Sequence, residues 1–103
     1  MYGLIGKITA TAGQRDALAE ILLQGTGNMP GCLSYIVARD LTDGDALWIT
    51  EVWDNKASHQ ASLKLPAVQE AIARGRPMIA AFSHRVETAP LGGDGLQDQE
   101  RLD

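Results

Sequence analysis

The order of strand-like and helix-like segments constrains the fold of this chain more than any other feature of its sequence. Residues 2–11 alternate in polarity and are rich in β-branched side chains, which is typical of a strand. Residues 14–28 instead carry Leu18, Ile21 and Leu22 on one side at helical spacing. This segment ends among Gly and Asn residues, which favour helix termination. We therefore expect a strand followed at once by an amphipathic helix.

The middle of the chain predicts a β-hairpin. Residues 32–41 alternate so that Leu33, Tyr35 and Val37 share one face. The turn sequence TDGD then precedes the third strand, residues 46–53. Asp-Gly favours a hairpin because it tolerates the positive φ angles of tight turns. Both faces of the third strand are apolar, so we expect both to be covered.

Three further elements are expected, at residues 56–64, 66–75 and 82–88. Asp54 or Asn55 can cap the first of these helical segments, and Pro66 suits the first turn of the second. Pro77 then disrupts the helix. On the fourth strand, simple alternation places three side chains on one face: Phe82, His84 and Val86.

This order predicts an α+β fold of the ferredoxin-like βαββαβ type, a four-stranded antiparallel sheet with helices on one face. Residues 1–90 would form this domain, and the acidic, Gly-rich residues 91–103 a flexible tail. If Trp48 and Val52 occupy the open face, a monomer would expose a large apolar patch. We therefore expect a homodimer in which two sheets pack face to face.

Charge and cysteine content limit the partners and the cellular compartment that we expect for this chain. The formal net charge is −4 and no basic stripe is present, so nucleic acid is not an expected partner. Cys32 is the sole cysteine, which rules out an internal disulfide and fits a reducing compartment. No segment resembles a signal peptide or an apolar membrane span. We expect a cytoplasmic protein that does not bind membranes.

Three sequence features together resemble the antibiotic biosynthesis monooxygenase family of dimeric α+β barrels. They are PGCLSY at residues 30–35, the pattern D-x-x-x-L-x-I-x-E-x-W from Asp43 to Trp53, and His59 six residues later. The resemblance covers residues 2 to about 88. It implies a monooxygenase that oxidises a quinol or polyphenol with O₂ as co-substrate and without metal or cofactor. Because the substrate anion itself donates the electrons, the protein must bind an aromatic molecule in a dry pocket and favour its anion.

Other functions stay open. Some relatives isomerise or degrade small carbonyl metabolites, and a non-catalytic, stress-associated binding dimer is a further alternative. The resemblance implies that haem-degrading relatives carry an Asn on the first strand and a His that binds the iron. Residues 2–11 contain no Asn, and Leu63 stands where that His would fall, so haem is not expected. The family's oxygenases also carry an amide on the strand before the Trp. Ile49 is found in that neighbourhood here, so a different substrate contact is expected.

Trp53 and His59 are the candidate catalytic residues. Trp53 ends the third strand, where its indole can form an apolar wall with one N–H donor or can simply be a large core residue. His59 lies early in the next helix and can accept a phenolic proton, or it can be a packing residue. Glu51 can orient His59 or a substrate hydroxyl, but a buried acid is more often structural.

The remaining candidates are substrate-binding residues. Tyr35 is expected to line either the same cleft or the dimer interface, and Ile49 shares a face with Glu51. Arg74 and Arg76 can steady the charge of a substrate anion if they point inward. Cations at a helix end also interact favourably with the helix dipole, so a structural role is the alternative for both.

Overall fold

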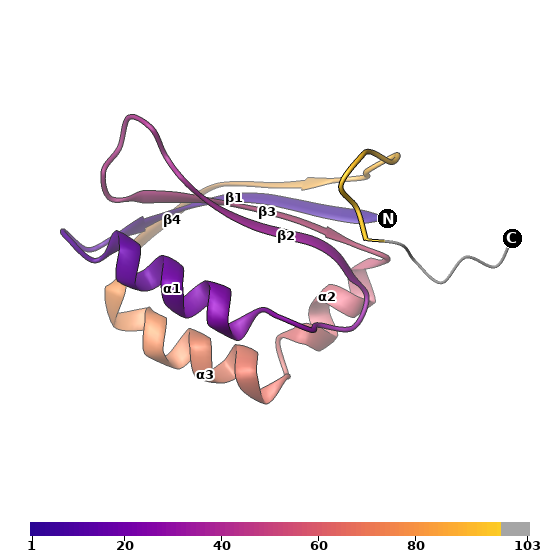
Figure 1. Cartoon of the computed structure of the whole chain (residues 1–103), viewed down its shortest axis with the longest axis horizontal. Coiled ribbons are helices and arrows are strands. Elements are labelled where there is room, and N and C mark those ends of the chain that lie inside the picture. The colour runs from indigo at the N-terminus through magenta and orange to yellow at the C-terminus, as the bar shows by residue number, and fades with distance from the viewer. Residues whose placement is uncertain (98–103) are drawn as a thin grey trace, which may run out of the picture.

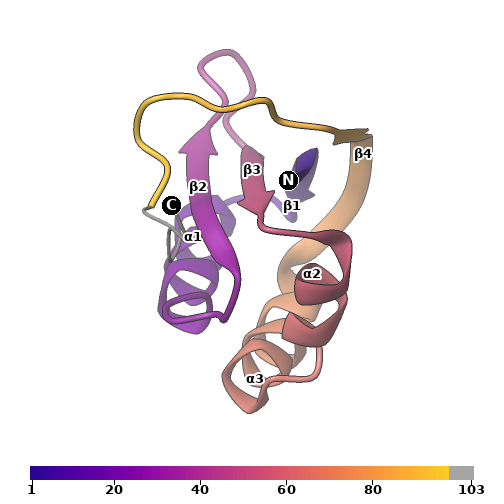
Figure 2. The same ribbon diagram turned by 90° about the vertical axis from the view of Figure 1, so that its right-hand side faces the viewer.

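The computed structural model describes residues 1–97 of the 103-residue chain, which form a sheet with helices on one face (Figures 1 and 2). The strands are β1 (Tyr2–Ala10), β2 (Cys32–Arg39), β3 (Ala46–Trp53) and β4 (Ile79–Thr88). The helices are α1 (Arg15–Gly25), α2 (Lys56–Ser62) and α3 (Pro66–Gly75), with a 3-10 turn at Arg76–Met78. The strand order is β2-β3-β1-β4 and all pairings are antiparallel, which confirms the predicted ferredoxin-like α+β fold.

The register of the central strands β1 and β3 decides which side chains meet the helices. Leu4 lies opposite Glu51, and Ile8 lies opposite Leu47. The side chains of Leu4, Ile8 and Leu47 are buried, so this face of the sheet packs against the helices. Because side chains alternate along a strand, Trp48 belongs to the opposite, open face.

Small residues let α1 and α3 pack closely together. Gly25, in the last turn of α1, is buried, and a Cβ at this position would overlap the Cβ of Ala71 on α3. Leu18, one of the apolar residues predicted on this side of α1, is fully buried. The expected amphipathic helix is thus present, although it spans residues 15–25 instead of 14–28.

Capping and proline set the limits of α2 and α3. The Asn55 side chain accepts a hydrogen bond from the backbone N–H of Ser58 at 2.8 Å, which makes Asn55 the N-cap of α2. Pro66 is the first residue of α3, where a missing N–H removes no helical hydrogen bond. Pro77 lies in the 3-10 turn that separates α3 from β4, as the predicted helix disruption requires.

β4 differs from the sequence prediction in its start and in its alternation. It begins at Ile79, directly after the 3-10 turn, not at residue 82. Phe82 pairs with Ile8 on the helix-facing side, whereas Val86 pairs with a residue of the open side. The register shifts between these pairs, and His84 there has a φ of 52°. The predicted common face for Phe82, His84 and Val86 is wrong because this β-bulge reverses the alternation.

The segment after β4 crosses the open face at one end of the sheet (Figure 2). Pro90 lies over Gly3 of β1, because a Cβ at Gly3 would be 3.0 Å from the Pro90 ring. The backbone N–H of Gln97 then donates a 2.9 Å hydrogen bond to the carbonyl of Leu33 on β2. The flexibility predicted for the tail stays a prediction, and residues 98–103 lie outside the part that the structure describes.

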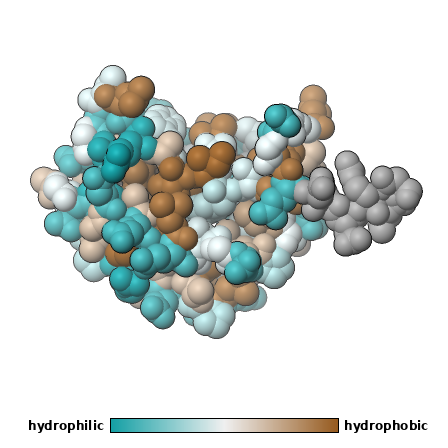
Figure 3. Space-filling view, in the orientation of Figure 1, coloured by the Kyte–Doolittle hydropathy of each residue, from teal (hydrophilic) through white to brown (hydrophobic). Residues whose placement is uncertain are grey.

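Apolar side chains are exposed on the open face. Ile36 on β2 is 54% exposed and Val86 on β4 is 49% exposed. Trp48 is half-buried beside them and donates its indole N–H to Asp40 at 2.7 Å. Figure 3 shows a separate apolar area on the side of the molecule, where β2 lies above α1. No helix within residues 1–97 has the length and hydrophobicity of a membrane span.

Candidate active site

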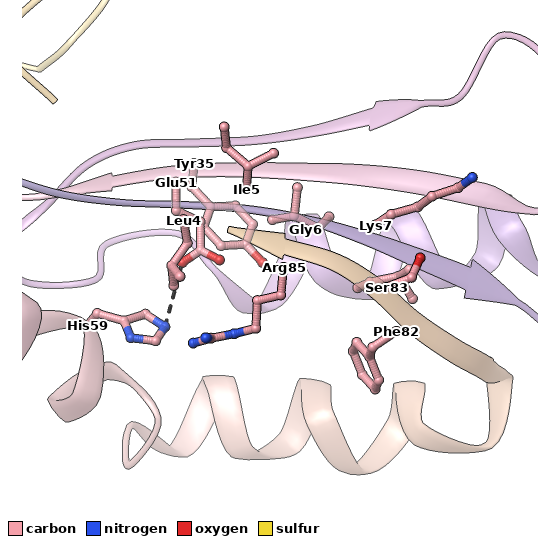
Figure 4. A pocket seen from close by; sticks show the side chains of 12 residues that line it. Leu4, Ile5, Gly6, Lys7, Tyr35, Glu51, His59, Phe82, Ser83 and Arg85 are labelled. Atoms are coloured by element: carbon pink, nitrogen blue, oxygen red, sulfur yellow. Dashed lines mark ion pairs between the residues drawn. The ribbon is translucent and has the colours of Figure 1, made fainter. Parts of the chain in front are cut away.

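A cavity of about 240 Å³ lies on the helix-facing side of the sheet, beside α2 (Figure 4). Its lining is mainly apolar, with a polar group at one end. The residues that line it include Leu4, Ile8, Tyr35, Ile49, Glu51, His59 and Arg85. An apolar cavity of ~150 Å³ is enough to bind benzene, so this one can accept a substituted aromatic ring.

Glu51 is held at the cavity wall by the strand end behind it. Glu51 and Trp53 lie two residues apart on β3, so both project toward the helices. The indole N–H of Trp53 donates a 3.0 Å hydrogen bond to Glu51 Oε1. The Glu51 side chain is only 15% exposed. Burial raises the pKa of its carboxyl, against opposing effects from the Trp53 N–H and from His59.

His59 lies near the same carboxylate oxygen of Glu51. The Asn55 cap starts α2 four residues earlier, which places His59 one turn into the helix. His59 Nε2 lies 3.9 Å from Glu51 Oε1, too far for a hydrogen bond but close enough for an ion pair if the ring is protonated. The imidazole also meets the Trp53 indole edge-on, with 5.5 Å between ring centroids.

Tyr35 and Ile49 complete the wall beside Glu51. Tyr35 on β2 pairs directly with Glu51 on β3, and Ile49 precedes Glu51 on the same face. Burial raises the pKa of the Tyr35 phenol well above its usual range, with a further contribution from the Glu51 charge. The Tyr35 hydroxyl therefore stays protonated and can serve as a hydrogen-bond donor in the cavity.

Trp53 lies behind the cavity wall and contacts the cavity through Glu51. It is 1% exposed and packs with Met29 and Val68 in the core. Trp53 is not among the residues that line the cavity, so the structure gives it the core role and not that of an apolar cavity wall. Its ring is part of the core, and its N–H positions a cavity carboxylate.

Arg85 is a cavity residue that the sequence reasoning missed. Figure 4 shows its guanidinium extending from β4 toward Glu51 and His59. The charge of Arg85 also lowers the pKa of Glu51, although less than burial raises it. Arg85 directly follows His84, the residue with positive φ, so the bulge that reverses β4 also directs Arg85 to the helix-facing side. The alternating sequence of β4 does not indicate a positive φ at His84. The sequence alone therefore does not predict that Arg85 lines the cavity.

Arg74 and Arg76 lie away from this cavity. Arg74 is exposed in the last turn of α3, and Arg76 begins the 3-10 turn that follows. Arg76 lines a second cavity, between α1, α3 and β4. The structure therefore does not bring either residue to Glu51 and His59. Within residues 1–97, no group of three or more His, Cys, Asp or Glu side chains is arranged to hold a metal ion.

The chain is similar to proteins of one family over most of its length. A family model described as antibiotic biosynthesis monooxygenase matches residues 1–74. A solved structure from Chloroflexus aurantiacus, provisionally named an antibiotic biosynthesis monooxygenase, is 64% identical. The match covers 92% of this chain and 97% of that one, with a TM-score of 0.90.

Two more distant structures carry the same provisional name. The Deinococcus radiodurans protein is 29% identical over 96% of this chain and 99% of its own, with a TM-score of 0.68. The Nitrosomonas europaea protein is 14% identical over 89% of this chain and 100% of its own, and its TM-score of 0.79 shows a shared fold only. No match was found among functionally curated proteins.

Proposed function

Because the chain belongs to the antibiotic biosynthesis monooxygenase family, we propose that it is a cofactor-independent monooxygenase of a small aromatic quinol or polyphenol. The observation that carries this proposal is the grouping of Glu51, His59 and Arg85 at one end of an apolar cavity. The cavity volume of about 240 Å³ suits a single substituted ring. An acid-base group beside a cation is what forming a phenolate in a dry pocket requires.

His59 is the proposed base. Its imidazole accepts the phenolic proton, and the Glu51 carboxylate, 3.9 Å from Nε2, stabilises the imidazolium that results. The Arg85 guanidinium and the Tyr35 hydroxyl face the same space and would interact with the phenolate oxygen. Trp53 is a positioning residue in this scheme, since it acts by holding Glu51.

The proposed reaction balances with only the substrate and O₂ as reactants. The substrate anion passes one electron to O₂, and the resulting radical pair combines to form a carbon–oxygen bond on the ring. Cleavage of the O–O bond leaves one oxygen atom on the ring as a carbonyl and releases the other as water. The ring loses two hydrogens and becomes a quinone, and both hydrogens leave in that water molecule.

Oxygen uptake tests the proposal. The purified protein would be incubated with a panel of reduced quinones after treatment with a chelator, and product quinones would be quantified. We expect O₂ consumption equal to product formation, with His59→Ala reducing kcat at least tenfold. The control Lys64→Ala changes a charged residue at the end of the same helical region, outside the cavity, and should leave kcat unchanged. Turnover that persists without O₂, or no turnover with any quinol, would refute the proposal.

We also propose that the protein is a homodimer formed through the open face of the sheet. Support comes from the exposed apolar residues Ile36 and Val86, which lie on this face. Sedimentation analysis should give a dimer mass for the wild type and a monomer for Ile36→Glu. Leu23→Glu is the matched control, because Leu23 is 57% exposed but lies on α1. A monomeric wild-type protein would refute this assembly.

A further inference from the structure

A second cavity, larger than the first, adjoins the candidate site. It has a volume of about 340 Å³ and lies between α1, α3 and the start of β4. Leu18 and Leu22 contribute from α1, Ile72 from α3 and Ile79 from β4, so the lining is almost entirely apolar. Arg76 is the charged residue at its margin. A cavity of this character holds water poorly and favours an apolar occupant.

The two cavities share a wall. Ile8 and Phe82 line both of them. Figure 4 shows the Phe82 ring extending from β4 toward α3, beside the space into which Arg85 and His59 point. Phe82 is 71% exposed, which is unusual for a large aromatic side chain and means that the core does not hold its ring in place. Its side chain can therefore change rotamer without disturbing the core.

This arrangement has a polar end and an apolar end. Glu51, His59 and Arg85 stand at the first, and the aliphatic side chains of α1 and α3 surround the second. A ligand that fills both would need an ionisable aromatic head and an aliphatic extension. The first cavity is large enough for one substituted ring, and the second for a chain of several carbons.

We propose that the substrate is an alkyl-substituted phenol or quinol whose chain occupies the second cavity, with Phe82 as the movable partition. This inference rests on the proposed oxygenase function, because it assigns the aromatic head to the first cavity. Burial of the chain would lower KM, while kcat, which depends on the head group, would change little.

A chain-length series tests the inference. The probes are a head-only quinol and its butyl and octyl derivatives, assayed by oxygen uptake with the wild type. Each methylene buried in the second cavity should lower KM about two- to fourfold. KM that does not change with chain length would mean that the alkyl chain does not enter this cavity, and would overturn the inference.

A matched pair of variants locates the effect. Ala80 lines the second cavity, whereas Ala73 is exposed on α3 and lines neither cavity. Ala80→Leu should remove most of the gain from the octyl chain and leave the KM of the head-only quinol unchanged, while Ala73→Leu should behave as the wild type. If Ala80→Leu does not fold, Ile72→Phe fills the same cavity from α3. A plugged variant that keeps the full octyl gain would overturn the inference.

Binding measurements separate this inference from the proposed function. Calorimetric titration with redox-inert 4-alkylphenols reports occupancy without oxidation. Chain-length-dependent binding that Ala80→Leu abolishes, together with no O₂ uptake from any quinol, would refute the oxygenase and keep the second cavity as a ligand site. Turnover of the head-only quinol with no effect of chain length on either KM or binding would refute the second cavity and keep the oxygenase.

Discussion

The hydrogen bond between Trp53 and Glu51 should be measurable as a coupling free energy. Trp53→Phe keeps an aromatic ring in the core but removes the N–H that lies 3.0 Å from Glu51 Oε1. Loss of a hydrogen bond to an ionised acceptor costs about 1.5–3 kcal/mol of unfolding free energy. Because Trp53 is 1% exposed, the smaller ring also leaves a cavity, which adds about 1 kcal/mol.

The reciprocal change completes a double-mutant cycle. Glu51→Leu removes the acceptor and leaves the buried indole N–H without a partner, at a cost of about 1–3 kcal/mol. When both partners are absent, neither polar group is left unpaired. The double variant should therefore be more stable than the sum of the two single losses predicts, by about 1–3 kcal/mol.

Urea unfolding followed by far-ultraviolet circular dichroism at pH 7 would provide the four free energies. All four proteins must be compared at one protomer concentration, since dimerisation would make the apparent stability concentration-dependent. Unchanged m-values would show that the unfolded states are comparable. Losses that add to within about 0.5 kcal/mol would refute the reasoning, because Trp53 would then not be what holds Glu51 at the cavity.

Three further outcomes are expected from single substitutions. Gly25→Val should lower the unfolding free energy by about 1–3 kcal/mol in urea titrations, because its side chain meets Ala71; Gly27→Val, with open space around its Cβ, should lose clearly less. Burial raises the pKa of the Glu51 carboxyl, so the protonated carboxyl favours folding at pH values below the ordinary pKa of 4.5, and this contribution is lost as pH rises through the raised pKa. The wild type should therefore lose stability relative to Glu51→Gln as pH rises across that window. Equal pH profiles of stability for the two proteins would contradict this. Gly3→Val should displace the segment after β4, detected as faster hydrogen exchange of the Gln97 amide, and unchanged exchange would contradict the packing described here.

The fold was predictable because local signals agreed along most of the chain. The Asn55 cap and the proline that opens α3 each act over a few residues, and the structure contains both. The predicted hairpin also forms between β2 and β3, but Gly44 does not have the positive φ expected of it; the Asp40 carboxylate instead accepts hydrogen bonds from the backbone N–H groups of Thr42 and Asp43 in this loop. The alternation of β3 likewise predicted that Ile49, Glu51 and Trp53 project to one side, and the register with β1 places this side under the helices. The periodicity of the side chains and the capping signals therefore predict this part of the structure without tertiary information.

The candidate site was only partly predictable, because one bulge decides which residues of β4 reach it. Strict alternation places Arg85 on the face opposite Phe82, whereas both line the cavity in the structure. The extra residue at His84 arises from pairing with β1, which a single strand's sequence does not reveal. Arg74 and Arg76 were candidates because a cation can steady a substrate anion, but neither lines the cavity that contains His59.

The segment from Pro90 to Gln97 begins over Gly3 on the open face and ends against the outer strand β2, so it lies beside the surface where the proposed second subunit would dock. In a two-fold symmetric pair, this segment would occur twice beside that junction. Shortening the chain at residue 90 should alter self-association more than it alters the fold.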